Sequence, residues 1–229
     1  MINYKNFEIL SFDCYGTLID WENGIIPVLH NLISNHKINI TEQKLLEMFA
    51  KFESEAEAGE YRKYREIIKQ VVKKFGEELG FQPTELELNC LANSIKNWQP
   101  FPDTITALQT LKQKYRLAII SNIDNDLFAD TVKHLEVEFD FVITAEQTQS
   151  YKPAKNNFEF AINKMKIAPE KLLHIAQSIY HDIVPAKGIG LSTIWVNRRQ
   201  EKKGFGATLP ASSKPDLEVP DLKTLVDLM

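Results

Sequence analysis

Four short groups of polar residues carry the side chains that a hydrolase needs, although they lie far apart in the sequence. They are Asp13-Cys14-Tyr15-Gly16-Thr17, Ser121-Asn122, Lys152 and the segment from Gln177 to Asp182. A carboxylate such as Asp13 can attack a carbon atom and form a covalent ester. Hydroxyl groups and a lysine can bind an anion or hold a carboxylate ionised. A second carboxylate, such as Asp182, can orient or deprotonate water.

Each group also has an ordinary structural explanation when it is taken alone. An Asp after a strand is common as a turn or helix-capping residue, and Ser121-Asn122 is typical of a turn. Lys152 precedes a proline and can be a solvated surface residue. Asp182, near a helix start, can complement the helix dipole. The functional interpretation therefore depends on the elements that bring the groups together.

The groups follow apolar runs that are typical of buried parallel strands. The expected strands are 7–13, 117–120, 141–144, 172–176 and 193–196, with an edge strand near Leu217. The expected helices between and after them are 103–114, 125–135, 155–166, 180–188 and a last one from Pro220. Such alternation predicts an α/β fold with a Rossmann-like parallel-sheet core. Since parallel sheets bind ligands at the carboxyl ends of their strands, we expect the four groups to meet there.

Residues 20–99 show a different spacing of apolar residues. Apolar residues recur at helical spacing in 24–34, 41–52, 61–79 and 84–98. Thr41 is a plausible helix start, and Gly59 and Gly80 are plausible stops. We therefore expect two units: an α/β core formed by 1–19 and 100–229, and an inserted helical cap formed by 20–99.

The composition limits the classes of partner. The 229 residues include 27 Lys and Arg against 31 Asp and Glu, a net charge of −4, so we expect no nucleic-acid partner and no anionic membrane surface. No apolar run is long enough to span a bilayer. The two cysteines form neither a disulfide framework nor a zinc site. With no secretory signal visible at the N-terminus, the expected location is the cytoplasm.

The order of the four groups resembles the haloacid dehalogenase superfamily over essentially the whole chain. Within it, the chain is most similar to the two-haloacid dehalogenases, because Tyr15 stands where the phosphatases have a second Asp. That Asp protonates a departing alkoxide in the phosphatases, whereas a departing halide needs no proton. Gln177 stands where the phosphatases have a metal-binding acid, which favours a reaction without Mg²⁺ or another cofactor.

The resemblance implies a role for each candidate residue. Asp13 attacks carbon two of a small anionic haloacid, and Asp182 and Ser178 position the water that hydrolyses the resulting ester. Thr17, Ser121, Asn122 and Lys152 hold Asp13 ionised and oriented, or contact the substrate carboxylate. Tyr15 forms an apolar wall for the halogen. Arg62 and Arg65 steer the anion from the cap, because residues 49–52 contain no arginine.

Some features depart from the dehalogenase pattern, so two alternatives stay open. The fourth group has phosphatase-like spacing, and Phe158 stands where well-studied dehalogenases have Tyr. One alternative is a Mg²⁺-dependent phosphatase of small phosphate esters, and the other is a binding protein for a small anion that does not turn it over. Either a monomer or a homodimer is compatible with the sequence.

Overall fold

The computed structural model describes residues 2–229. Six parallel strands form one sheet in the order β3-β2-β1-β4-β5-β6. The strands are β1 (Ile9–Phe12), β2 (Arg116–Ser121), β3 (Phe141–Thr144), β4 (Leu172–Ala176), β5 (Ser192–Val196) and β6 (Leu217–Val219). The predicted α/β class with a Rossmann-like parallel sheet is confirmed.

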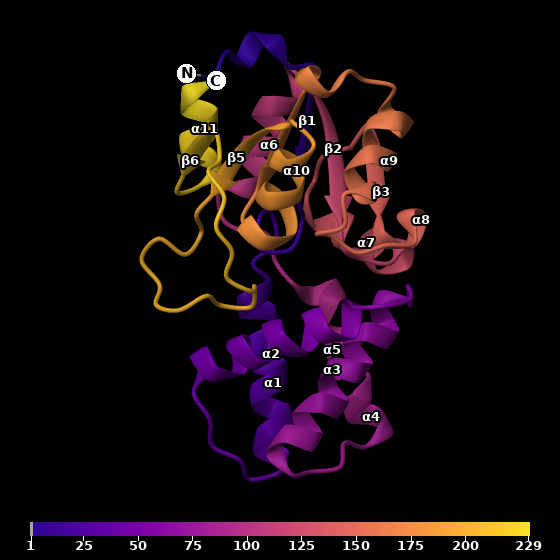
Figure 1. The fold of residues 1–229 in the computed structure, drawn as a ribbon. Helices are drawn as coiled ribbons and strands as arrows, with labels where there is room; N and C mark the ends of the chain where they lie inside the picture. The colour runs from indigo at the N-terminus through magenta and orange to yellow at the C-terminus, as the bar shows by residue number, and fades with distance from the viewer. Residues whose placement is uncertain (1) are drawn as a thin grey trace.

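Helices cover both faces of this sheet (Figure 1). They are α6 (Thr104–Lys112), α7 (Asn125–Thr131), α8 (Ala145–Thr148), α9 (Asn156–Met165), α10 (Val184–Gly188) and α11 (Leu222–Leu228). Strand side chains alternate between the two cores, because successive residues of a strand point to opposite faces. On β2, Leu117 and Ile119 join one apolar cluster, while Ala118 and Ile120 join the other with Phe158 of α9. Phe158 is therefore a core residue.

Residues between β1 and α6 fold into a layer of helices beyond one end of the sheet (Figure 1). They are α1 (Trp21–Asn35), α2 (Glu42–Glu57), α3 (Tyr64–Leu79), α4 (Glu85–Leu88) and α5 (Cys90–Ser94). Thr41 caps α2 by accepting from Lys44 N, and Gly80 ends α3 in the left-handed region with φ 76°. We propose that residues 20–99 act as one cap unit over the sheet.

Two predicted helices differ from the observed ones. The helix expected over 84–98 is broken into α4, α5 and a 3-10 turn at Ile95–Asn97. Asn89 interrupts it, because its side chain bonds back to Glu85 O and competes with continued helix. The helix expected over 180–188 begins with a wider π-helical turn, Ile179–Ile183, before α10.

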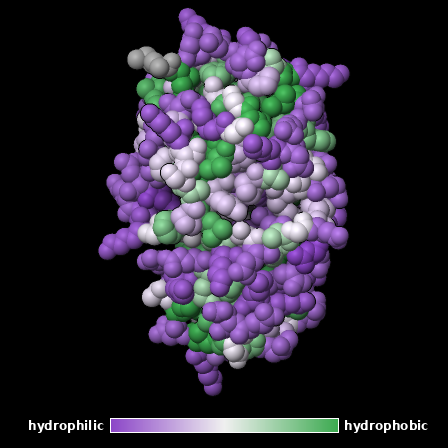
Figure 2. Space-filling model, viewed as in Figure 1, coloured by the Kyte–Doolittle hydropathy of each residue, from purple (hydrophilic) through white to green (hydrophobic). Residues whose placement is uncertain are grey.

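The face of the molecule seen in Figure 2 is mostly polar. Polar residues cover most of that face, and apolar residues appear between them in separate groups (Figure 2). Among the helices of residues 2–229, none combines the length and apolar character that crossing a membrane requires.

One aspartate of the core anchors the helical layer. α3 has no capping side chain of its own at Lys63. Instead Asp124, in the loop after β2, accepts from Tyr64 N at 2.8 Å and from Arg65 N at 3.0 Å. Asp124 is fully buried, so these two bonds satisfy amides at the start of α3 that have no partner within the helix.

Replacing Asp124 with Ala should lower the free energy of unfolding by about 1–3 kcal/mol, because two helix-end amides lose their acceptor. Urea unfolding followed by circular dichroism measures the change. Asp126→Ala is the matched control, since its pair with Arg65 is exposed and should contribute less than about 1 kcal/mol. Equal losses in the two variants would contradict the anchoring role.

Candidate active site

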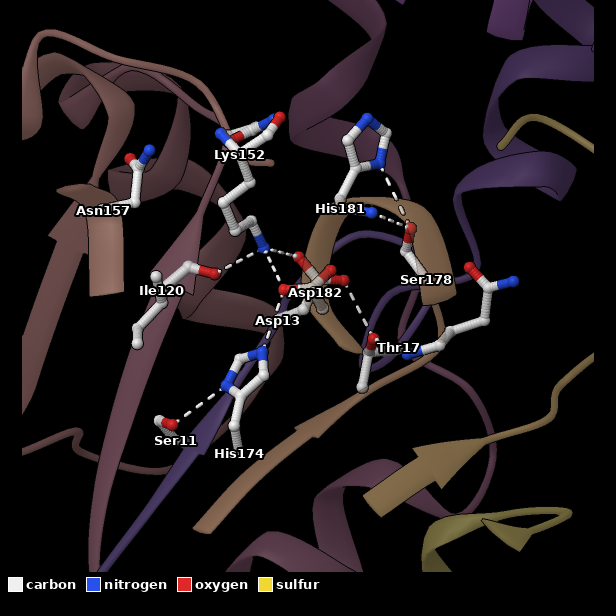
Figure 3. A network of polar contacts seen from close by, with 12 residues as sticks. Ser11, Asp13, Thr17, Ile120, Lys152, Asn157, His174, Ser178, His181 and Asp182 are labelled. Carbon is white, nitrogen blue, oxygen red and sulfur yellow. Dashed lines mark hydrogen bonds and ion pairs between the residues drawn. The ribbon is translucent and has the colours of Figure 1, made fainter. Parts of the chain in front are cut away.

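A buried lysine joins two aspartates at the carboxyl end of the sheet (Figure 3). Lys152 Nζ lies 2.9 Å from Asp13 Oδ1 and 2.6 Å from Asp182 Oδ1, and it donates a third bond to Ile120 O at 2.8 Å. Asp13 directly follows β1, and Asp182 lies in the π-helical turn after β4. All three side chains are almost completely buried. Every N–H of the ammonium group therefore has an acceptor within the protein.

Burial and charge set the ionisation of this cluster. Burial raises the pKa of Asp13, and the attraction of Lys152 offsets this only in part. For Asp182, burial acts upward, but Lys152 and His174 outweigh it and lower the pKa. Burial alone would lower the pKa of Lys152, yet the two carboxylates raise it. Lys152 thus stays charged and Asp182 ionised, while Asp13 is the member of the cluster that protonates most readily.

Two further side chains orient Asp13 and Lys152. Thr17 Oγ1 donates to Asp13 Oδ2 at 2.9 Å and accepts from the amide of Gln177 at 2.9 Å, so it links the β1 and β4 loops. Asn122 binds the backbone of Lys152 on both sides: Oδ1 accepts from its N–H at 2.7 Å, and Nδ2 donates to its C=O at 3.0 Å.

A histidine inside the sheet supports Asp182 from below (Figure 3). His174 on β4 lies with Nε2 2.9 Å from Asp182 Oδ1 and Nδ1 2.9 Å from Ser11 Oγ. Both His174 and Ser11 have no exposed surface. If Ser11 donates to Nδ1, the proton of a neutral ring sits on Nε2, where it can bond Asp182. Asp182 Oδ2 has no hydrogen-bond partner among the described residues.

The loop after β1 needs glycine at position 16. Gly16 has φ 93°, and a Cβ there would lie 2.9 Å from Trp21 Nε1 and 3.1 Å from Gln177 Oε1. A larger residue would therefore force this loop away from the β4 loop.

A small cavity lies between the aspartate-lysine cluster and the helical layer. From the core it is lined by Asp13, Tyr15, Ser121, Asn122, Lys152, Ser178, His181, Asp182 and Thr208, and from the helices by Trp21, Glu53, Glu57 and Tyr64.

Most of the candidates taken from the sequence lie at this cavity. Asp13, Tyr15, Ser121, Asn122, Lys152, Ser178 and Asp182 line it, and Thr17 lies just behind Asp13. Ser178 also caps the π-helical turn, because its hydroxyl accepts from His181 N at 2.8 Å. Tyr15 donates to or accepts from Thr131 Oγ1 at 2.8 Å, and its ring meets Trp98 edge-on.

The two arginines that the sequence analysis expects to steer the substrate anion, Arg62 and Arg65, do not line the cavity. Arg62 is exposed, and its guanidinium donates to Ala56 O at 2.7 Å. Arg65 forms an ion pair with Asp126 at the surface. Tyr64, the first residue of α3, is buried, whereas the guanidinium groups of Arg62, which precedes the helix, and Arg65 are bound by Ala56 O and Asp126 away from the cavity.

Several cavity residues were not among the candidates taken from the sequence, and these include Glu53, Glu57, Tyr64, His181 and Thr208. Glu53 and Glu57 lie one helical turn apart on α2 at otherwise apolar positions of that face, beside Phe49 and Phe52. Charged residues on a buried helical face are a signal of a site, because burying them is costly. His181 precedes Asp182 within the fourth group, so its position was available from the same motif.

The carboxyl groups from α2 are held in a buried setting. Burial raises the pKa of Glu53 to about 7, although the Tyr64 hydroxyl, which donates to Oε1, opposes the change. Burial and the nearby Glu53 raise the pKa of Glu57 well above its usual value. Burial also lowers the pKa of His181 to about 4, so its ring is neutral near pH 7.

Within residues 2–229, no group of three or more His, Cys, Asp or Glu side chains is arranged to hold a metal ion. The phosphatase-type metal position would involve residue 177, which is a neutral glutamine here. The positive charge that pairs with the carboxylates of Asp13 and Asp182 is that of the Lys152 ammonium group.

Comparison with known proteins gives a consistent result. The model of the haloacid dehalogenase-like hydrolases matches residues 7–190. Haloacetate dehalogenase H-2 of Moraxella sp. is 27% identical over 98% of this chain and 99% of its own. Glyceraldehyde 3-phosphate phosphatase of Methanothermobacter thermautotrophicus is 29% identical over 81% and 84%. The structure of L-2-haloacid dehalogenase from Xanthobacter autotrophicus superposes with a TM-score of 0.81 at 21% identity, covering 97% and 98% of the two chains.

Replacing Lys152 with Met should lower the free energy of unfolding at pH 8 by about 3–5 kcal/mol, because it leaves two buried carboxylates without a cation. Both carboxyls then have pKa values above those in the unfolded chain. The folded state therefore binds more protons than the unfolded one, and stability recovers as the pH falls. Urea unfolding at pH 8 and pH 5 measures this.

The matched control is Lys112→Met. Lys112 pairs with Asp140 at the partly exposed surface, and the pKa of Asp140 lies below its usual value, since Lys112 and the Leu117 amide outweigh burial. The Lys112→Met variant should lose less free energy of unfolding than Lys152→Met, and its loss should be the same at pH 8 and pH 5. A Lys152→Met protein as stable as wild type at pH 8 would contradict the account of the cluster.

Proposed function

The chain belongs to the haloacid dehalogenase-like hydrolases, and we propose that it displaces halide from a small 2-haloalkanoic acid through an ester on Asp13. The observation that carries the proposal is the placement of one carboxylate, Asp13, at the wall of a cavity with both oxygens oriented by Lys152 and Thr17. A carboxylate held in this way can attack a carbon atom of a substrate bound in the cavity.

In the first step an oxygen of Asp13 attacks carbon two of the substrate from the side opposite the halogen. The new C–O bond forms as the carbon–halogen bond breaks, and the halide leaves with the bonding pair. Lys152 opposes the effect of burial on the pKa of Asp13 and so favours its ionised form for this attack. The helical layer shields the cavity, so the carboxylate reacts without a full hydration shell.

In the second step water attacks the ester at the carbonyl carbon of Asp13. Asp182 is positioned to take the water proton, because Oδ2 has no partner among the described residues while Oδ1 is held by Lys152 and His174. The tetrahedral intermediate then collapses, and the bond between the substrate oxygen and the Asp13 carbonyl carbon breaks. The departing alkoxide takes the proton held by Asp182 and leaves as the 2-hydroxy acid, which restores the carboxylate of Asp13. Ser178 supports this step through the turn that carries Asp182.

The surroundings of Tyr15 favour a leaving group that needs no proton. The side chain that replaces the phosphatase acid is a phenol bound to Thr131. Burial raises its pKa well above the usual value, so it is a poor acid. Halide leaves as a weak base, whereas an alkoxide requires a donor at this point of the loop. We therefore favour dehalogenation over phosphate-ester cleavage as the activity of this chain. We assign the reaction no cofactor.

Halide release from chloroacetate, fluoroacetate and both 2-chloropropionate enantiomers tests this function. We expect release from at least one of them with EDTA present, because Lys152 supplies the positive charge. Asp13→Asn should lower kcat/KM by at least about 10³-fold, since the nucleophile is lost. A halide electrode or ion chromatography follows the reaction.

Asp227→Asn is the matched control, because Asp227 is exposed and pairs with Lys223 far from the cavity. Its activity should equal that of wild type. If no substrate releases halide, while p-nitrophenyl phosphate is hydrolysed only with Mg²⁺, the phosphatase alternative replaces this proposal.

A further inference from the structure

The cavity lacks a charged donor for the carboxylate of a haloacid. Lys152 has three N–H groups, and all three are bound by Asp13, Asp182 and Ile120 O. Arg62 and Arg65 lie outside the cavity. A substrate carboxylate inside it must therefore bind to uncharged donors.

His181 offers one such donor. Ser178 Oγ accepts from the His181 amide at 2.8 Å and lies 3.2 Å from Nδ1, so its hydroxyl proton can point to Nδ1 (Figure 3). The neutral ring then carries its proton on Nε2. This atom is buried and has no hydrogen-bond partner within residues 2–229. A buried N–H without an acceptor is costly, which indicates that a ligand or water accepts from it.

Glu57 lies next to this free N–H. Glu57 Oε2 is 4.0 Å from His181 Nε2, too far for a hydrogen bond. At this separation one ligand oxygen can lie within bonding distance of both atoms. The other oxygen, Oε1, accepts from Asn122 Nδ2 at 3.3 Å, so the carboxyl group is oriented.

Glu57 can also donate. Its side chain is only 7% exposed. Burial and the neighbouring Glu53 raise its pKa well above the usual value, against the opposing effects of Lys152 and Asn122. A protonated carboxyl group has an O–H donor, which can bond to an anionic oxygen.

We propose that His181 and Glu57 together bind the carboxylate of the substrate, with Glu57 acting as a hydrogen-bond donor in place of an arginine. This assignment rests on the proposed function, because it takes a small carboxylic acid as the ligand. His181 contributes the core side of the site and Glu57 the α2 side, so the helical layer takes part in choosing the substrate.

A consequence is that anion binding weakens with rising pH. When Glu57 ionises it loses its donor and repels the ligand, so binding must then be accompanied by uptake of one proton. The dissociation constant should rise by about tenfold per pH unit above the pKa of Glu57. The other titratable groups that face Glu57 are Asp13, Glu53, Tyr64, Tyr151, Lys152, His181 and Asp182.

Propionate is a suitable probe, because it has the carboxylate but no halogen and cannot turn over. Its dissociation constant is measured by titration calorimetry between pH 5.5 and 9.5 for wild type, Glu57→Gln and Glu60→Gln. Gln at position 57 keeps the bond from Asn122 and donates at every pH. Glu60 is exposed at the end of the same segment, so Glu60→Gln changes the net charge equally without touching the cavity.

We expect wild type and Glu60→Gln to lose at least tenfold in affinity across this range. Glu57→Gln should bind propionate at high pH at least tenfold more tightly than wild type, because its amide still donates there. Titration of Asp13 and Glu53 acts on both proteins alike, so it does not produce this difference. Wild-type binding that does not change with pH, or a Glu57→Gln profile equal to that of wild type, would overturn the assignment.

The same experiment separates this inference from the proposed reaction. If propionate binds as expected but no haloacid releases halide, the carboxylate site stands and the reaction assignment fails. If halide is released while Glu57→Gln and wild type bind propionate identically at all pH values, the reaction stands and the role of Glu57 is wrong.

Discussion

The three N–H donors of one buried lysine, Lys152, are shared between Asp13, Asp182 and a backbone carbonyl of β2, and the site is organised around this arrangement. Charges removed from water are tolerated only when they are paired and hydrogen-bonded, so each group constrains the others. The requirement brings together the loop after β1, the segment after α8 and the turn after β4. Thr17 binds the second oxygen of Asp13, His174 binds Asp182, and Asn122 holds the backbone of Lys152. Asp13 is thereby oriented at the cavity wall, next to the charge that favours its ionised form.

Much of this was predictable because strand ends are recognisable in the sequence. The apolar runs predicted the parallel sheet, and the topology of such sheets placed Asp13, Ser121, Lys152 and Asp182 at one edge. The position of the arginines was not predictable in the same way. Arg62 and Arg65 flank Tyr64, and only the docking of α3 on Asp124 decides which of these side chains turns inward. Glu53 and Glu57 of α2 were missed because charged residues are ordinarily assigned to the solvated face of a helix.

Some of the hydrogen bonds that join the helical layer to the sheet involve residues at or next to the cavity. Asp124 caps α3, Asn122 bonds to Glu57, and the Tyr151 hydroxyl donates to Arg62 O at 2.7 Å. Asn122 and Tyr151 are also neighbours of the reacting groups, through Lys152. Contacts that orient the nucleophile therefore also set the position of α2 and of its carboxyl groups. This shared framework explains how a site with an unusual, acidic wall can retain the geometry of the aspartate-lysine cluster.

The central claim is that Asp13 becomes covalently bonded to the substrate, and isotope transfer tests it most directly. A single turnover is run in ¹⁸O-water with enzyme in excess over 2-chloropropionate, and the peptide that contains Asp13 is analysed by mass spectrometry. Hydrolysis of an aspartyl ester at its carbonyl carbon places one ¹⁸O atom in Asp13 and leaves the 2-hydroxyl group of the product unlabelled. Label in that hydroxyl group, with none in Asp13, would show direct attack of water on the substrate and contradict the account.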